Sequence, residues 1–176
     1  MLTEAFMDAN KRREKIIAIL NDAGKPVSAS SLAAKCQVSR QIIVGDVALM
    51  RASGMDITAT PRGYILNSKN EKPCIRIACR HDSAGMKDEL YAIVDEGATV
   101  LDVMVEHPLY GQLTGSLHLS NRHDVDEFIN KSTKAEAQPL SVLTEGIHLH
   151  TIEVPDEETL KRVKNNLAKL GILLEG

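Results

Sequence analysis

The stretch GIHLHTIEV, residues 146–154, places two histidines two positions apart in a run rich in β-prone residues. Side chains alternate between the two faces of a strand, so His148 and His150 would lie on one face, within reach of a single metal ion or anion. An isolated His-x-His can equally be a surface pair. The meaning of this pair therefore depends on what the rest of the chain supplies.

The apolar residues of the same stretch pose a difficulty. Ile147 and Leu149 face opposite to Ile152 and Val154 if the alternation is regular. The strand is therefore expected to be buried on both faces or to carry a bulge near Thr151.

The residues around this stretch alternate between strand and helix patterns. Apolar residues with period two predict strands over 74–80, 99–106 and 110–119, while helical spacing predicts helices over 85–96, after Asn121, and before Gly171. The resulting order is β-α-β-β-α-β-α. This order favours an antiparallel or mixed sheet with helices on one face, an open-faced α/β sandwich in the α+β class, with one sheet face free for a partner.

The first third of the chain has a different organisation, typical of a winged helix-turn-helix. A helix over 11–22 is followed by Gly24, and Ser28 and Ser39 are suitable N-caps for two further helices. Two short β-prone runs joined through Pro61-Arg62-Gly63 predict the hairpin of a wing.

The helical part of this region carries a recognisable motif, formed by LAAK (32–35), VSRQ (38–41), DV (46–47) and MRASG (50–54). The motif resembles the helix-turn-helix of biotin-repressor-type bacterial regulators. The resemblance implies that the third helix presents a set of residues to the DNA groove and that the wing contacts phosphate or the minor groove. The groove-facing residues are Arg40, Gln41, Val44 and Gly45, and the wing residue is Arg62; each could instead belong to a solvated surface.

Length and charge agree with two domains. A chain of 176 residues with 43% hydrophobic content can form one medium domain or two small ones. Residues 1–67 carry nine basic against six acidic residues, whereas residues 68–176 carry twelve against eighteen. We expect a DNA-binding domain over 1–67, a linker over 68–73 and a second domain over 74–176 that does not touch nucleic acid.

The sequence also indicates the cellular compartment in which the protein is expected. It has no apolar run long enough to span a membrane and no signal-peptide pattern at residues 1–5, so a cytoplasmic protein is expected. The three cysteines lack a C-x-x-C spacing and imply neither a disulfide framework nor a cysteine zinc site. We interpret them as small apolar residues.

Two further residues can join the histidine pair. Glu89 lies at the edge of the apolar face of its helix, where a carboxylate needs a partner, and His81 continues the inward row of the strand over 74–80. Together with His148 and His150 they form a donor set suited to zinc, nickel, iron or manganese. We predict that the four residues converge.

Residues 74–172 resemble the three-histidine (3H) domain, and the full chain resembles niacin-responsive transcriptional repressors. The likeness rests on His81, Glu89, and the runs HPLYG (107–111), NRHDV (121–125) and GIHLHT (146–151). It implies an HPr-like fold and a repressor of NAD-biosynthesis or niacin-uptake genes that binds nicotinic acid as co-repressor. It also implies a metal ion, zinc or nickel before iron or manganese, held by His81, Glu89, His148 and His150. His107 is a rival for one of the three histidines, and the effector would bind near them.

Such a repressor is not an enzyme, and it is expected to bind two-fold operators as a homodimer. Three alternatives stay open. One is a metal-dependent enzyme that acts on a nicotinate-like metabolite. Another is a regulator of the same architecture with a different small-molecule effector. The third is a phosphocarrier-like domain, suggested only by the expected fold.

Overall fold

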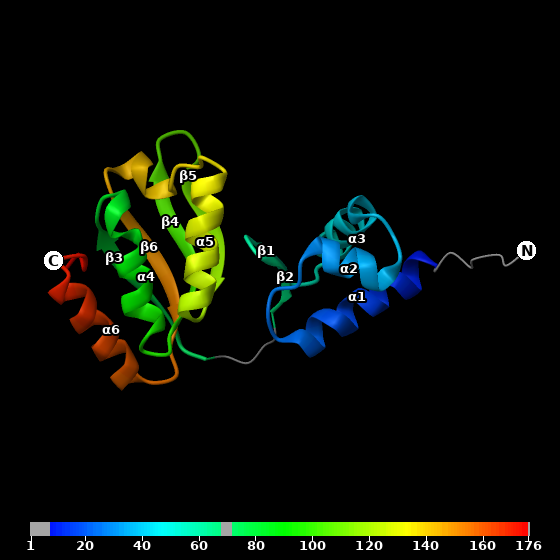
Figure 1. The fold of residues 1–176 in the computed structure, drawn as a ribbon, viewed down its shortest axis with the longest axis horizontal. Coiled ribbons are helices and arrows are strands. Elements are labelled where there is room, and N and C mark those ends of the chain that lie inside the picture. The colour runs from blue at the N-terminus through cyan, green and yellow to red at the C-terminus, as the bar shows by residue number, and fades with distance from the viewer. Residues whose placement is uncertain (1–7, 68–71, 176) are drawn as a thin grey trace, which may run out of the picture. The chain divides into compact units, whose positions relative to one another are not determined.

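The computed structural model describes residues 8–67 and 72–175, which form two compact units. The two units are coloured blue to cyan-green and green to red in Figure 1, and each is described by itself. The expected linker, 68–73, lies largely outside the described residues.

The first unit is a three-helix bundle with a β-hairpin. Its elements are α1 (Ala9–Ala23), α2 (Ala29–Cys36), α3 (Arg40–Ala52), β1 (Ile57–Thr60) and β2 (Gly63–Leu66). The side chain of Ser28 accepts the amide of Ser31, and that of Ser39 accepts the amide of Ile42, so both expected N-caps are present. These caps set the start of α2 and of α3, and β1 and β2 pair antiparallel as the wing.

One apolar cluster holds this unit together. Ile16 and Leu20 of α1, Leu32 of α2, and Ile43 and Val47 of α3 are each no more than 1% exposed. The same spacing that buries Ile43 and Val47 leaves the opposite face of α3 open to solvent. The third helix is thus anchored along one side and available along the other.

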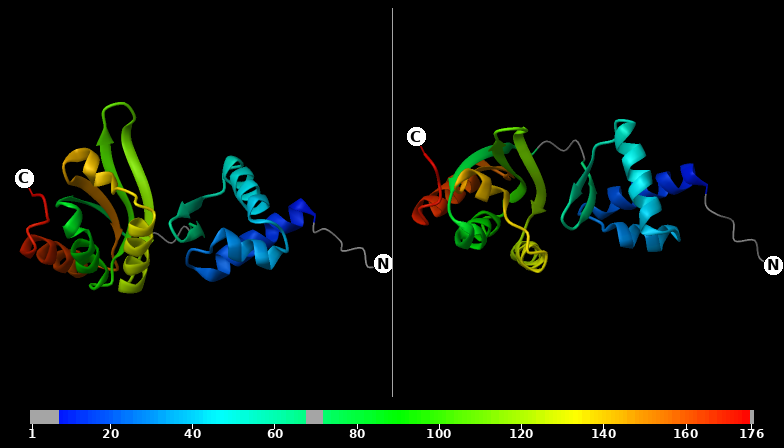
Figure 2. Two further views of the ribbon diagram at one scale, coloured as in Figure 1. Left: turned by 45° about the horizontal axis from the view of Figure 1, so that its top comes forward. Right: turned by 90° about the horizontal axis from the view of Figure 1, so that it is seen from above.

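The second unit is a four-stranded antiparallel sheet with helices on one face. Its elements are β3 (Cys74–Arg80), a short 3-10 helix η1 (Ser83–Gly85), α4 (Met86–Val94), β4 (Thr99–His107), β5 (Gly111–Leu119), α5 (Arg122–Lys134), a second 3-10 helix η2 (Leu140–Thr144), β6 (Ile147–Glu153) and α6 (Glu157–Lys169). The strand order is β3-β6-β4-β5, with antiparallel pairing throughout. Figure 2 shows α4, α5 and α6 on the same side of the sheet. The predicted α+β class is confirmed.

The central strand β6 resolves the difficulty in its alternation. His148, His150 and Ile152 are each no more than 3% exposed and face the helices, while Ile147 and Leu149 are 43% and 37% exposed. Both sequence-based expectations for this strand are therefore wrong, because β6 is regular and its open face carries partly exposed apolar residues. The irregularity lies instead in β4, where the register shifts between Val100 and Asp102.

Within the described residues, no helix is both long enough and apolar enough to cross a membrane.

Candidate metal centre and nucleic-acid interface

The centre of the site is the carboxylate of Glu89. Helix α4 buries Leu90, Ile93 and Val94 against the sheet, and Glu89 shares that side of the helix. Its residue exposure is 1%. A charge at this depth requires polar partners, and three histidines and one cysteine surround the carboxylate.

The histidines reach Glu89 from two neighbouring strands. In the pairing of β3 with β6, Cys79 lies opposite His148 and Ile77 lies opposite His150, while His81 follows the end of β3. Nε2 of His81 is 2.7 Å from Oε2 of Glu89, and Nε2 of His148 is 2.9 Å from Oε1. Nε2 of His150 is 3.3 Å from Oε2. The structure thus brings together the four residues that the sequence singled out.

Each of the three rings is oriented through its other nitrogen. Nδ1 of His81 contacts the carbonyl of Asp82 at 2.5 Å, Nδ1 of His148 contacts that of Gly146 at 2.8 Å, and Nδ1 of His150 contacts that of Asp102 at 2.7 Å. A carbonyl oxygen only accepts, so each Nδ1 carries the proton. In the neutral ring, Nε2 then directs its lone pair at the cluster centre.

This orientation creates an electrostatic conflict that a cation relieves. A neutral Nε2 and a carboxylate oxygen are both acceptors, so their close approach is favourable only with a proton or a metal ion between them. Burial acts to lower the pKa of His81 and of His150, but contact with the Glu89 carboxylate outweighs it and raises both pKa values. Burial acts to raise the pKa of Glu89, but the contacts with His148, His150 and His81 outweigh it and hold this pKa well below its usual value.

The donors fit a divalent transition metal. Three imidazole nitrogens and a carboxylate are ligands that zinc, nickel and iron accept, and hydrogen bonds from Nδ1 to carbonyls are the usual support of metal-binding histidines. Among the described residues, the buried Nε2 of His150 finds no well-aligned hydrogen-bond partner. This nitrogen and the carboxylate it faces could share a proton or bind one metal ion together.

Cys79 also belongs to this cluster, which sequence reasoning missed. Potential ligand atoms of Cys79, Glu89 and His148 lie within 4.8 Å of one another. Burial and the nearby Glu89 carboxylate raise the pKa of the Cys79 thiol far above its ordinary value, so it stays protonated. Only the register of β3 against β6 places Cys79 beside His148, and the sequence gives no local signal of that pairing.

Gly146 joins the centre to the loop before β6. Its carbonyl oxygen accepts a hydrogen bond from Nδ1 of His148 and is 3.4 Å from the amide of His81. Its own amide donates to the carbonyl of Ser141 in η2 at 2.8 Å. Gly146 has φ +90, and an added Cβ would lie 2.3 Å from the carbonyl oxygen of His81. The loop and the centre are therefore mechanically connected at a position that requires glycine.

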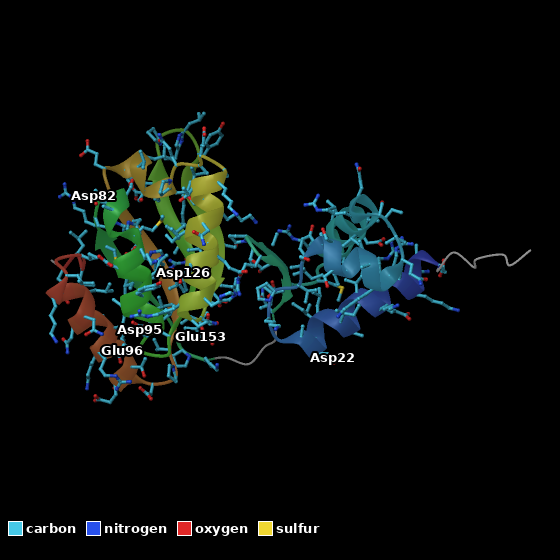
Figure 3. All side chains as sticks on the ribbon, in the orientation of Figure 1. Asp22, Asp82, Asp95, Glu96, Asp126 and Glu153 are labelled. Carbon is cyan, nitrogen blue, oxygen red and sulfur yellow. The ribbon has the colours of Figure 1, made fainter. Side chains whose placement is uncertain are left out.

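A hollow of about 460 Å³ lies next to the centre, at the end of the sheet where β3 ends and β6 begins. Asp82, labelled in Figure 3, marks this end of the unit. The lining residues are Arg80, His81, Asp82, Ser83, Ser141, Val142, Glu145 and Gly146. Of the three clustered histidines, His81 alone appears in this lining, so a ligand in the hollow would reach the centre through His81.

The other histidines have local roles. Nδ1 of His107 accepts the amides of Leu109 and Tyr110 at 3.1 and 3.3 Å, which fixes the turn between β4 and β5 and makes His107 a poor rival for the cluster. His118 is half-buried in β5 with φ +54, and His123 is exposed, 3.7 Å from Glu127.

Arg122 at the start of α5 is bound by residues of α4 and of the turn that follows it. It donates from Nε and a terminal nitrogen to Asp95 at 2.7 and 2.6 Å, and it stacks 4.2 Å from the ring centre of Tyr91. Arg122 therefore braces α5 against α4.

The predicted DNA-contacting residues of α3 lie on its solvent side. Arg40, Gln41, Val44 and Gly45 are all exposed, and a Cβ added to Gly45 would meet no atom within 4 Å. Arg62 in the wing turn differs, because it is half-buried rather than fully exposed. The four helix residues can reach a groove, while Arg62 has less freedom to do so.

Helix α3 is held by an ion pair that the sequence pattern did not reveal. Asp46 is 4% exposed, and it accepts hydrogen bonds from Nε and a terminal nitrogen of Arg12 at 2.5 and 3.2 Å. A nitrogen of Arg13 lies 3.5 Å from the same carboxylate. These contacts tie α3 to α1 and thereby set how α3 presents its exposed face.

A winged helix-turn-helix joined to a separate unit is an architecture typical of DNA-binding regulators. Residues 12–65 match the helix-turn-helix domain family, and residues 74–176 match the 3H domain family. The chain is 42% identical over 165 residues to a probable transcription repressor NiaR of Thermotoga maritima, covering 94% of each chain. It is 39% identical over 174 residues to a transcription repressor NadR of Bacillus subtilis, covering 97% of this chain and 96% of the relative.

The chain therefore belongs to the family of helix-turn-helix and 3H-domain proteins that includes these two repressors. The resemblance inferred from the sequence is confirmed. Because relatives that cover almost the whole chain are named as transcription repressors, the comparisons support a regulator rather than an enzyme.

Proposed function

We propose that this protein represses NAD-biosynthesis or niacin-uptake genes by binding operator DNA when nicotinic acid occupies its 3H domain. The observation that carries the proposal is the convergence of three oriented histidines on the buried Glu89, beside a hollow in the domain joined to the winged helix-turn-helix. A hollow of about 460 Å³ next to polar groups with perturbed pKa values is a suitable site for a small ligand.

In this proposal His81, Glu89, His148 and His150 hold one divalent metal ion, zinc or nickel in the first place and iron or manganese otherwise. The metal supplies a positive charge that satisfies the facing acceptors and gives the site a fixed shape. The Nδ1 bonds to the carbonyls of Asp82, Gly146 and Asp102 hold the three rings in the ligating orientation.

In this proposal the first unit binds the DNA. Arg40 and Gln41 lie in the first turn of α3, where side chains and backbone amides can meet phosphates and base edges, and Val44 and Gly45 extend that surface by one turn. Arg62 adds a wing contact. A homodimer would place two such helices in successive major grooves of a two-fold operator. Nicotinic acid can act only by binding the DNA-competent arrangement more tightly than the alternative.

The test is operator affinity measured by fluorescence anisotropy with and without nicotinic acid. The operator is first selected by the protein from random duplexes, and each measurement is repeated over a salt series because phosphate contacts dominate affinity. Nicotinic acid is expected to tighten binding at least about tenfold, equivalent to about 1.4 kcal/mol of coupling. The His148→Ala protein and chelated wild type should lose this response.

The matched control is His123→Ala, which changes an exposed histidine of the same unit. It should respond like wild type. A wild-type affinity that ignores nicotinic acid but responds to another metabolite would show that the effector is wrong. A normal response in His148→Ala would show that the cluster is not the sensor.

A further inference from the structure

The thiol of Cys79 lies inside the buried cluster, although the four-residue donor set of the proposed metal centre does not include it. Cys79 is 0% exposed and lies opposite His148 in the pairing of β3 with β6. Ligand atoms of Cys79, Glu89 and His148 all lie within 4.8 Å of one another, and within the described residues this is the trio that meets such a spacing. The sulfur is therefore placed as a potential metal ligand rather than as an ordinary core side chain.

The spacing of the trio is close to that of a metal shell. Zinc binds nitrogen or oxygen at about 2.0 Å and sulfur at about 2.3 Å, so two ligands of one tetrahedral ion lie about 3.4 to 3.6 Å apart. Starting from the 4.8 Å limit, each pair of ligand atoms would close by at most about 1.4 Å, shared between two side chains. Side-chain rotation on β3, β6 and α4 can supply such a movement without a change of fold.

A second buried group is available to an ion at the same place. Nε2 of His150 has no well-aligned hydrogen-bond partner among the residues that the structure describes, and it lies 3.3 Å from Oε2 of Glu89. His150 is only 3% exposed, so water does not reach this nitrogen from the surface. The thiol and the free imidazole nitrogen thus lie beside one carboxylate, with ligand atoms of three different kinds.

A thiol in this position changes which ion the cluster prefers. Imidazole and carboxylate ligands accept zinc, nickel, iron and manganese, whereas thiolate is a soft ligand that favours zinc over manganese. An ion that binds Cys79 replaces the thiol proton, so the sulfur–hydrogen bond breaks, the sulfur–metal bond forms and the proton leaves to solvent. Zinc can expand from four ligands to five, so the sulfur need not displace a histidine.

We infer that Cys79 is a fifth donor of the metal centre, and that it makes this chain select thiophilic ions over manganese. The inference rests on the proposed metal site at His81, Glu89, His148 and His150, and it adds a ligand that this site does not contain.

The test uses the full chain loaded with cobalt(II), because a sulfur–cobalt bond gives a near-ultraviolet charge-transfer band that nitrogen and oxygen ligands do not give. Wild type should show this band on binding a single cobalt ion per chain. Cys79→Ser and Cys79→Val should bind cobalt without the band, and valine preserves apolar packing at the buried position. In competition with a chromogenic chelator, both variants should bind zinc at least about tenfold more weakly and manganese less than about threefold more weakly.

The matched control is Cys74→Ser. Cys74 is the exposed cysteine at the other end of β3, where it pairs with Glu153. This variant leaves Cys79 as the one cysteine of the second unit, since Cys36 belongs to the first. It should keep the band and both affinities, and it tests the assignment to Cys79 even if the buried substitutions prevent folding.

The outcomes separate this inference from the proposed function. Cobalt bound by wild type without the band overturns the fifth donor and leaves the four-residue site standing. Loss of the band in Cys74→Ser also overturns it, because the sulfur is then that of Cys74. Equal weakening of zinc and manganese in Cys79→Val shows a packing role and overturns the selectivity. A wild type that shows the band and prefers zinc but ignores nicotinic acid leaves this inference standing and overturns the proposed effector. Binding of no metal ion overturns both.

Discussion

Substitution of Gly146 by alanine should damage the fold and the metal centre together. An added Cβ would lie 2.3 Å from the carbonyl oxygen of His81, and the residue has φ +90. A side chain at positive φ costs about 1 to 2 kcal/mol. Relief of the clash must also move the carbonyl of Gly146. Nδ1 of His148 and the amide of His81 both contact this carbonyl. Two such bonds are worth about 1 kcal/mol each, so the total should reach about 3 to 4 kcal/mol.

Gly97→Ala isolates the backbone part of this cost. Gly97 has φ +86, almost the same as Gly146, but a Cβ there meets no atom within 4 Å. This variant should lose only the strain of about 1 to 2 kcal/mol and keep its metal. Both residues belong to the second unit, so their unfolding transitions can be compared directly.

The free energy of unfolding is measured by urea unfolding and, separately, by calorimetry. The metal content of each folded protein is measured by mass spectrometry. Gly146→Ala should be about 2 kcal/mol less stable than Gly97→Ala and should bind metal more weakly. Equal stability of the two variants would refute the argument that the close approach at His81 matters. Full metal content in Gly146→Ala would refute the argument that its carbonyl positions His148.

Four shorter predictions follow from single contacts. Glu89→Gln keeps the size of the side chain but removes its charge, and it should lower metal affinity at least about tenfold in a competition assay with a chromogenic chelator; unchanged affinity would exclude Glu89 as a ligand. Asp46→Asn should destabilise the first unit by about 2 to 3 kcal/mol in urea unfolding, because it removes the buried negative charge that Arg12 and Arg13 contact; a loss below about 0.5 kcal/mol would show that the charge is dispensable. Gly45→Ala should stabilise α3 by up to about 1 kcal/mol while it weakens operator binding, since the open space at Gly45 is suited to the DNA backbone; unchanged affinity would remove Gly45 from the interface. Arg40→Ala should reduce the slope of log affinity against log salt by about 1 if Arg40 contacts a phosphate, and an unchanged slope would exclude that contact.

The sequence predicted most of the fold because the signals involved are local. Serine caps, helical spacing and β alternation act over a few residues, and they placed the helices of the first unit and the strands of the second close to their observed bounds. The same alternation put His148 and His150 on one face of β6, and helical spacing put Glu89 beside the apolar face of α4. These features depend only on the local helix or strand, so they would be the same in any fold that contains these helices and strands.

The tertiary structure decided what the local pattern leaves open. Strand register brought Cys79 beside His148 and put the irregularity in β4, opposite Ile152 and Thr151, rather than in β6 itself, because pairing partners are distant in sequence. Packing likewise determined that Arg122 is bound by Asp95 while Arg80 lines the hollow. The stretch GIHLHTIEV by itself fixes which histidines share a face. That their Nε2 atoms meet one buried carboxylate depends on contacts with Glu89, which lies 59 positions from His148, and on strand pairing and burial that no local propensity encodes.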